Sequence, residues 1–480
     1  MLFFRPLPEA TLFVSRLSND LAKWGRWPLS NTQAWFIALM ITAMVLQGQI
    51  CWAAIDRATM GGVTTASLSW LLRRAKIPWA LLLKAAVTAL FEIFGITNAH
   101  IVFDDTDRVR SKTTRKLFGV FKTKDKKTGG YCNAQNVVFI LLVTDVFTVP
   151  IGFAFYRPDP KVQKWKANDK VLRKKGIKKK NRPSKPESDR YPNRIELAQK
   201  LLARAHKFLS GITVVVGGKV QPIRIVSVLA DAAYLTKGLG KYTRYYFPKA
   251  QLISQVAKSQ ICWNKSGTKK SVEAFFANQV PVTDKVKIRG GAEKLITYCS
   301  ARLFIKSHGV RLHIVALKYD NETEYRYLAA TELTWRTLDI IRTYSLRWLI
   351  EVAIEDWKQY DGYGRKAYQQ GAEGACRGVI LSLLVDCFLL QSSQQLRLYR
   401  AGKPLCTAGS LVRAIQFETI VGLIREVVEC PDPQAALKKL TSALPHIFVL
   451  RPSSKHMQGR DIGGLGPSPN LVRMQRTGTG

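Results

Sequence analysis

Apolar residues over the N-terminal part of the chain gather into runs of helical length. Long runs cover residues 34–55 and 79–94, and a shorter run over residues 68–76 ends just before Pro78. Because proline and glycine are typical of helix boundaries, this pattern predicts a helical N-terminal domain over residues 1–98. The helices that meet at Pro78 are also compatible with a DNA-binding helix-turn-helix, with ordinary helical packing as the alternative.

The run over residues 34–55 is about long enough to cross a bilayer. It contains Gln47, Gly48 and Gln49, and no second clear span follows. The first residues also lack the basic start and long apolar stretch of a signal peptide. A buried helix is therefore the preferred interpretation and no membrane partner is expected; a membrane protein with a basic cytoplasmic face is the alternative.

Shorter apolar runs, typical of strands, begin after residue 98. Strands are expected at residues 101–103, 136–144, 149–156 and 223–229, with a helix at residues 194–209 before the last strand. Three strands, a helix and a fourth strand form a mixed α/β order, so the predicted fold class is α/β.

The α/β core is expected to be interrupted by a β-rich insertion over residues 240–333. Its strand candidates lie at residues 251–256, 302–305, 312–317 and 325–330. Helical patterns then return, so the core would consist of residues 99–239 and 334–400. A C-terminal helical region over residues 401–457, which could serve dimerisation, and a disordered tail over residues 458–480 would follow.

Basic residues dominate the charge of the chain. Lys and Arg outnumber Asp and Glu by 74 to 34, which gives a formal net charge of +40. An imbalance of this size in a chain rich enough in apolar residues for a core predicts a polyanionic partner, most often DNA or RNA. Residues 161–185 hold twelve Lys or Arg and one Asp, and predict a flexible loop that grips phosphates. Its candidate phosphate contacts are Lys174, Lys175, Lys178, Lys179 and Lys180.

The eight cysteines and six histidines are scattered, with no CxxC pair and no HExxH motif. We therefore expect free thiols in a reducing compartment, no structural zinc and no catalysis by His-bound zinc.

A stripe of polar residues marks an otherwise largely apolar segment. At about 100° per residue on a helix, Tyr344, Arg347, Glu351 and Lys358 share a face roughly 60° wide. We expect a mostly buried helix that presents a carboxylate beside two cations and a phenol. Burying these groups is costly unless they serve each other, a metal or an anion, so the stripe predicts a site that handles phosphate.

Two aspartates follow apolar strand runs, at the strand ends where ligands gather in open α/β sheets. Asp104, Asp231 and Glu351 together offer hard oxygen donors from three separate elements, which suit Mg²⁺ or Mn²⁺. Two such ions about 4 Å apart can activate a nucleophile and stabilise the leaving oxygen in phosphodiester cleavage. Taken alone, each aspartate would more often be a turn or cap residue.

Neighbouring acids leave the ligand assignment open. Side chains alternate along a strand, so only one of the adjacent residues Asp104 and Asp105 can face the site. Asp104 is preferred because it follows the apolar run directly, with Asp105 and Asp107 as alternates. Glu355 lies one turn after Glu351 on the same helix face and could replace it as a ligand.

In these residues the chain resembles the DDE transposases of bacterial insertion sequences, specifically the branch marked by Tyr-(2)-Arg-(3)-Glu-(6)-Lys, where bracketed numbers count intervening residues. Tyr344, Arg347, Glu351 and Lys358 fit that signature without a gap. The segments IVFDDTDR and VLADAAY match the family's two aspartates, at the ends of the first and fourth strands of an RNase H-like core. The resemblance covers residues 95–400 and implies an RNase H-like mixed-sheet core with a β-rich insertion before the glutamate helix.

The resemblance also implies an activity. Such an enzyme would bind the inverted-repeat ends of its element, cut the DNA with water as nucleophile and join the 3′-hydroxyl ends to target DNA. Asp104, Asp231 and Glu351 would be catalytic and hold two Mg²⁺ or Mn²⁺ ions, while the other three residues of the stripe would contact phosphates. Joining two ends implies a homodimer on double-stranded DNA, in the bacterial cytoplasm at the nucleoid.

Two further interpretations keep part of this description. One is an RNase H-like nuclease or resolvase that cuts DNA without strand transfer. The other is a non-catalytic DNA-binding descendant of a transposase, against which the complete set of acids and the Tyr-Arg-Glu-Lys stripe argue.

Overall fold

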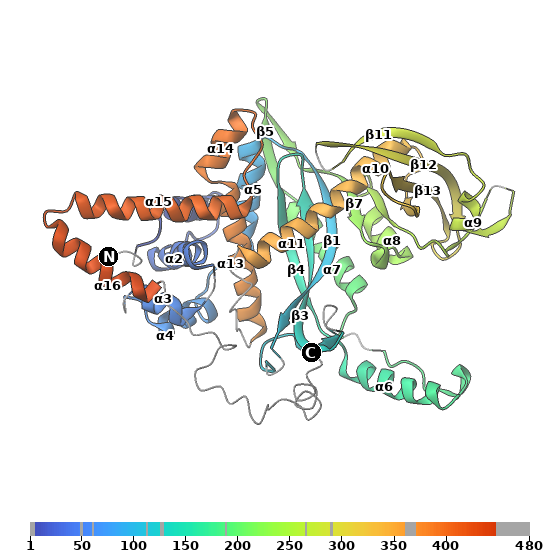
Figure 1. Ribbon diagram of the computed structural model, residues 1–480, viewed down its shortest axis with the longest axis horizontal. Helices are drawn as coiled ribbons and strands as arrows, with labels where there is room; N and C mark the ends of the chain where they lie inside the picture. Colours follow the sequence, from blue (N-terminus) through green and yellow to red (C-terminus); the bar gives the residue numbers. More distant parts are fainter. Residues whose placement is uncertain are drawn as a thin grey trace, which may run out of the picture.

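The computed structural model describes residues 5–48, 51–59, 62–111, 114–124, 129–187, 190–264, 266–288, 291–360 and 371–447. The chain begins with a group of helices and continues into a long mixed sheet with helices packed against it (Figure 1). The N-terminal helices are α1 (Pro8–Lys23), α2 (Asn31–Gln47), α3 (Trp52–Ala58), α4 (Thr65–Arg73) and α5 (Trp79–Phe94).

The long apolar run over residues 34–55 is divided between two helices. Ser30 caps α2 through a capping box with Gln33, and Gly48 ends this helix in the left-handed conformation, with φ 63°. A new helix, α3, begins at Trp52. No helix in the described part of the chain combines the length and the apolar character needed to cross a bilayer.

Of the two helices that meet near Pro78, the second one, α5, is a core helix. Ten residues of α5 are buried, and α5 packs against α1 and against α13 (Ala372–Leu390). Only Ala80 and Glu92 of α5 are exposed, so this helix has no free face that could enter a DNA groove. The helix-turn-helix therefore stays a prediction in which α4, with Trp70 and Arg73 exposed, is the helix that has a free face.

Five strands form the centre of the sheet, in the order β4, β3, β1, β7, β8. They are β1 (Asn98–Arg110), β3 (Tyr131–Val143), β4 (Thr148–Tyr156), β7 (Arg224–Ala230) and β8 (Gln251–Gln255). β1 is antiparallel to β3 and parallel to β7, β3 is antiparallel to β4, and β7 is parallel to β8. This mixed arrangement confirms the predicted α/β class and is consistent with an RNase H-like core.

Helices cover both faces of the central sheet. The flanking helices are α7 (Arg194–Leu209), α8 (Lys237–Tyr246), α10 (Thr337–Ser345) and α11 (Leu349–Gln359). Gly152 of β4 faces Leu201 of α7, whereas Phe139 of β3, which pairs with the next residue Phe153, packs against Trp357 of α11. Because alternate strand residues point to opposite faces, α7 and α11 lie on opposite sides of the sheet.

The β-rich insertion continues the core sheet. β14 pairs with β8, and the order runs on through β13, β12, β9 and β10, with β11 paired to β12. Its elements are β9 (Ile261–Trp263), β10 (Lys269–Ser271), α9 (Val272–Phe276), β11 (Val282–Ile288), β12 (Ala292–Ile305), β13 (Val310–Tyr319) and β14 (Arg326–Ala330). The sequence pattern placed residues 251–256 in the insertion, but β8 is a core strand parallel to β7. An apolar run predicts a strand without indicating which strand it pairs with.

The basic segment after β4 is mainly helical and not a flexible loop. α6 (Pro160–Lys174) is capped by Asp159 and followed by the 3₁₀ helix η1 (Lys179–Asn181). The nearly buried Asp169 binds Arg173 in the helix and Arg182 after it, at 2.9 and 2.6 Å, and so ties η1 back to α6. Figure 1 shows α6 projecting from the body of the molecule. The loop prediction is wrong because it counted the lysines and overlooked the cap and the central aspartate.

The C-terminal helices pack on the N-terminal ones. They are α13, α14 (Ser393–Arg400), α15 (Ala408–Val428) and α16 (Pro433–Ile447). α13 contacts α2, α4 and α5, α15 contacts α2, and α16 contacts α3. The predicted disordered tail, residues 458–480, lies outside the described residues.

The short elements that remain are β2 (Val120–Lys124), the hairpin β5 (Thr213–Val216) and β6 (Lys219–Pro222), and the 3₁₀ helices η2 (Ala232–Tyr234) and η3 (Leu346–Trp348). The eight cysteines are free thiols, as predicted.

Candidate active site

The centre of the sheet places Asp104 next to the end of β7. The pairing of β1 with β7 stops at Phe103 and Ala230, so Asp104 is the first residue of β1 beyond it, and Asp231 directly follows β7. The expectation that the first strand ends at Asp104 is wrong, because β3 keeps pairing with β1 as far as Arg110. The two aspartates nevertheless lie at the same edge of the β1–β7 pair.

Adjacent aspartates of β1 face opposite sides of the sheet. Asp104 faces the α11 side, where it pairs with Arg347. Asp105 faces the α7 side, where it pairs with Arg194 at the start of α7. Asp104 therefore shares a face with Glu351, while Asp105 is turned away from it.

The sequence predicted that the polar stripe lies on one helix. In the structure it lies on three consecutive helical segments. α10 passes through η3 into α11, and the backbone stays right-handed helical at both junctions. The stripe is also less buried than predicted: the side chain of Glu351 is 47% exposed and that of Arg347 is 17% exposed. Only Ile350 and Trp357 are buried in α11.

Arg347 bridges the two acids on this face. Its Nη2 lies 2.6 Å from Glu351 Oε1, and its Nη1 lies 3.6 Å from Asp104 Oδ2. Asp104, Glu351 and Lys358 line one open cavity of about 510 Å³. On its wall the Lys358 ammonium donates a hydrogen bond to the Thr106 hydroxyl. The structure thus brings together acids and cations that lie far apart in the sequence.

Glu355, the alternate to Glu351, lines the same cavity. Its carboxylate accepts a hydrogen bond from Gln359 at 2.8 Å and makes no recorded ion pair with any described residue. Glu351 differs because it is tied to Arg347, which also contacts Asp104.

The Asp104 carboxyl is strongly affected by its surroundings. Burial raises its pKa to about 6. The Asp105 amide, which donates a hydrogen bond of 2.7 Å to Asp104 Oδ1, and the Arg347 guanidinium oppose this rise, while Asp105 and Asp231 add to it. Asp104 is therefore a carboxylate whose negative charge is only partly compensated by its neighbours.

Asp231 and Tyr344 lie near this cavity without lining it. The Asp231 carboxylate accepts a 2.7 Å hydrogen bond from the amide of Ala232 and so caps η2. Burial raises the pKa of Tyr344, with the Arg347 charge opposing and the Asp231 charge adding to the rise. The Tyr344 hydroxyl is buried and lacks a hydrogen bond of ordinary geometry to any described residue.

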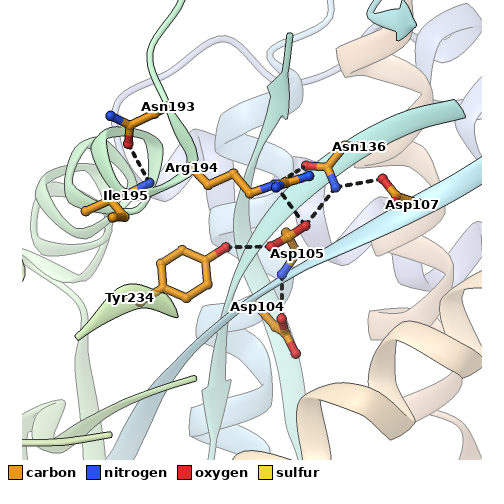
Figure 2. A network of polar contacts seen from close by, with 8 residues as sticks. All are labelled: Asp104, Asp105, Asp107, Asn136, Asn193, Arg194, Ile195 and Tyr234. Carbon is orange, nitrogen blue, oxygen red and sulfur yellow. Dashed lines mark hydrogen bonds and ion pairs between the residues drawn. The ribbon is translucent and has the colours of Figure 1, made fainter. Parts of the chain in front are cut away.

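On the opposite face of the sheet, a polar network surrounds Asp105 (Figure 2), and sequence reasoning missed three of its members, Tyr234, Asn136 and Arg194. Tyr234 donates a hydrogen bond of 3.0 Å to Asp105, Asn136 donates one of 2.7 Å, and Arg194 pairs with the same carboxylate at 3.1 Å. Asn136 also donates to Asp107, at 2.8 Å. The alternate Asp105, which also lines the cavity with Asp104, is held in this network by three partners, and the alternate Asp107 by Asn136.

Only weak sequence signals point to these partners. Tyr234 comes three residues after Asp231, and Asn136 is the polar residue at which the apolar part of β3 begins. Neither position reveals its contact with β1, because both contacts depend on strand pairing between distant segments.

Mg²⁺ or Mn²⁺ suits the donor chemistry of this site. Asp104, Asp231 and Glu351 offer carboxylate oxygens, and a cation would compensate the costly buried charge of Asp104. The three carboxylates are too far apart to bind one metal ion together. Within the described ranges, no group of three or more Asp, Glu, His or Cys residues is close enough to hold a metal ion. The positive charge between Asp104 and Glu351 is that of the Arg347 guanidinium, which pairs with both.

The basic residues predicted to contact phosphates fall into two groups. Arg347 and Lys358 lie at the Asp104 site. The others are exposed on the end of α6 and around η1, and none of them lines the cavity: Lys174, Lys175, Lys178, Lys179 and Lys180.

Comparisons with known proteins find little that is similar. No protein-family model matches the chain, and no curated protein matches it. A solved structure described as a piggyBac transposase synaptic complex with hairpin DNA is similar to it, with a TM-score of 0.39 and 10% sequence identity. The likeness covers 96% of this chain and 87% of that chain. A likeness of this degree carries no argument about what this chain binds or catalyses.

Proposed function

We propose that this protein is a DNA transposase that binds the inverted-repeat ends of an insertion sequence, cleaves the DNA and joins the 3′-hydroxyl ends to target DNA. The observation that supports this function best is that Asp104, Glu351 and Lys358 line one cavity, while Arg347 contacts both Asp104 and Glu351. Acids and cations gathered in this way are what a phosphodiester and its metal ions require.

The residues of the site would have distinct roles. Asp104, Asp231 and Glu351 would hold Mg²⁺ or Mn²⁺, which when bound would lower the pKa of a water nucleophile and stabilise the leaving oxygen. Arg347 would hold the phosphate with its two-pronged guanidinium, and Lys358 would add a point charge. The Thr106 hydroxyl keeps the Lys358 ammonium at the cavity wall.

Arg347 would change partners when DNA binds. In the structure its guanidinium pairs with Asp104 and Glu351 together. A DNA phosphate offers the same guanidinium a competing bidentate partner, and a metal ion can replace it between the two carboxylates.

The charge of the chain supports DNA as the partner. A net charge of +40 favours any polyanion. The α6 projection would extend the contact along the DNA backbone, because its lysines are exposed and the helix projects from the body of the molecule. Two element ends have to be joined, so the active form would be a homodimer on DNA.

Replacing the proposed metal ligand tests the function. We expect Glu351→Gln to bind element ends as well as the wild type does and to lose at least about 100-fold in Mg²⁺-dependent strand cleavage. Glu355→Gln is the matched variant, since it neutralises an acid of the same cavity one helical turn away. Cleavage that survives in Glu351→Gln and disappears in Glu355→Gln would move the ligand to Glu355.

A second assay separates transposition from simple cleavage. Element ends that are already cut, with free 3′-hydroxyl groups, are incubated with the protein, Mg²⁺ and a supercoiled target plasmid. A transposase joins these ends to the plasmid, and joining should be lost in Glu351→Gln. Cleavage of uncut ends without any joining of cut ends would assign the chain to the RNase H-like nucleases or resolvases.

A further inference from the structure

A second cavity, of about 240 Å³, lies at the outer strand β4 and is lined mainly by aromatic rings and guanidinium groups. Its rings and guanidinium groups come from Phe118, Phe153, Phe155, Tyr191, Arg157, Arg190 and Arg204. None of the residues that line it also lines the Asp104 cavity. The proposed cleavage chemistry therefore leaves this second cavity unexplained.

No acid in the described part of the chain compensates the positive charge of this cavity. In the described part of the chain no carboxylate lines it, and Arg157, Arg190 and Arg204 form no ion pair with any described acid. The Arg157 guanidinium lies over the rings of Phe118 and Tyr191, 5.2 and 5.4 Å from their centres. Aromatic rings and guanidinium groups without a described acid partner thus lie side by side. This combination suits a ligand that is both aromatic and anionic.

A chain of aromatic rings connects this cavity to the candidate active site. Phe153, on its wall, lies 6.4 Å from Phe139, and Phe139 lies 4.8 Å from Trp357 of α11. One aromatic ring, that of Phe139, therefore separates the wall of the second cavity from α11, the helix that carries Glu351 and Lys358.

We propose that this cavity binds one unpaired nucleotide, with its base stacked on the rings and its phosphate held by the arginines. Bases of any sequence stack on aromatic side chains, and guanidinium groups bind phosphate through paired hydrogen bonds. The volume is below the roughly 300–1,000 Å³ of pockets for larger ligands, so it suits a single nucleotide and excludes a duplex. The assignment of that nucleotide to a DNA strand rests on the proposed function, because strand opening next to the cleavage site would supply it.

A duplex with a short single-stranded overhang tests the proposal. The overhang carries the fluorescent base 2-aminopurine, and binding is measured in EDTA, so the result does not depend on metal ions or cleavage. We expect quenching of 2-aminopurine and about tenfold tighter binding of the overhang duplex than of a blunt duplex. Tyr191→Leu and Arg204→Gln should remove most of this preference, while Tyr191→Phe, which keeps the ring, should retain it.

Arg413→Gln is the control, since it removes the same charge from an exposed position on α15, away from the cavity. Arg204 is exposed on α7, so its variant should fold even where a change at Tyr191 disturbs packing. Equal binding of both duplexes by the wild type, or an unchanged preference in both Tyr191→Leu and Arg204→Gln, would overturn the proposal.

Competition identifies the source of the nucleotide. Displacement of the overhang by dAMP would assign the cavity to free nucleotides, and displacement by a short oligonucleotide alone would assign it to a DNA strand; both support the nucleotide site. If strand cleavage fails while the overhang preference persists, the proposed function is wrong and the cavity assignment stands.

Discussion

Asp104 and Asp105 are adjacent on β1 but differ in how many partners their carboxylates have. Asp105 accepts hydrogen bonds from Tyr234 and Asn136 and pairs with Arg194, so its oxygens are occupied. Asp104 has the amide of Asp105 and the more distant Arg347, and burial raises its pKa. The network around Asp105 fixes the backbone of β1, and Asp104 remains open to a cation.

We predict that Tyr234→Phe destabilises the protein. The buried Tyr234 hydroxyl donates to a carboxylate, so its loss should lower the free energy of unfolding by about 2 kcal/mol. Tyr344→Phe is the matched comparison, since the Tyr344 hydroxyl is buried without a hydrogen bond of ordinary geometry to a described residue. Its removal should leave stability unchanged or slightly increased. Guanidinium chloride unfolding of both variants measures the difference, and equal losses would contradict the role of the Asp105 network.

At the residue scale the sequence predicts which residue types meet, but not all of their contacts. Asp104, preferred because it follows the apolar run, and Glu351, chosen by the spacing from Tyr344 to Lys358, line the same cavity. Arg347 between the two acids was not predicted, because a signature spacing does not say which partners a guanidinium contacts. Asn136 and Arg194 were missed because they join the site only through strand pairing and helix packing.

At the scale of elements, α6 is an ordered projection and not a mobile arm. Asp159 caps the helix, Asp169 ties it to Arg182, and Trp165 donates a hydrogen bond of 2.8 Å to the carbonyl of Pro183. Because the helix and η1 are fixed to each other, their lysines form a surface of defined shape, and DNA binding would not have to order a disordered loop.

The double variant Lys179→Gln and Lys180→Gln tests this surface. Each phosphate contact contributes roughly 0.9 to the slope of log affinity against log salt, so losing both should flatten the slope by up to about 1.8. Lys438→Gln and Lys439→Gln remove two exposed charges from α16 and serve as the control. Fluorescence anisotropy with an element-end duplex at several KCl concentrations gives both slopes. A flattening of the same size in the control would show that only net charge matters.

Most other elements follow from the apolar pattern. The helices α5 and α7 begin and end where their proline, glycine or apolar boundaries predict, and the strands β3, β4, β7 and β13 are longer or shifted forms of the predicted runs. The apolar pattern does not predict segments in which polar residues continue an element, as in the second half of β1 and in α6. Pairing with β3 stabilises the second half of β1, and local ion pairs stabilise α6. Neither interaction produces a periodic apolar pattern in the sequence.

At the scale of the whole molecule, one hydrophobic core joins the N-terminal helices, the sheet and the C-terminal helices. Twelve residues of α13 are buried, and α13 packs on α2, α4 and α5, which come from the opposite end of the chain. The Arg377 side chain of α13 also donates a hydrogen bond of 2.7 Å to the carbonyl of Leu72 in α4. The sequence pattern suggested a separate domain over residues 1–98 because it shows where elements lie and not which elements share a core.

We therefore predict that residues 99–447 do not fold stably without the N-terminal helices. Each large apolar side chain of α13 that is exposed costs about 1.5–3 kcal/mol, and a handful of them would cancel a typical stability of about 5–15 kcal/mol. Circular dichroism and guanidinium chloride unfolding of the fragment should show no cooperative transition, and co-expression with residues 1–98 should restore one. If the fragment alone unfolds cooperatively at the midpoint of the full chain, the N-terminal helices are an independent domain, and their contacts with α13 contribute little to stability.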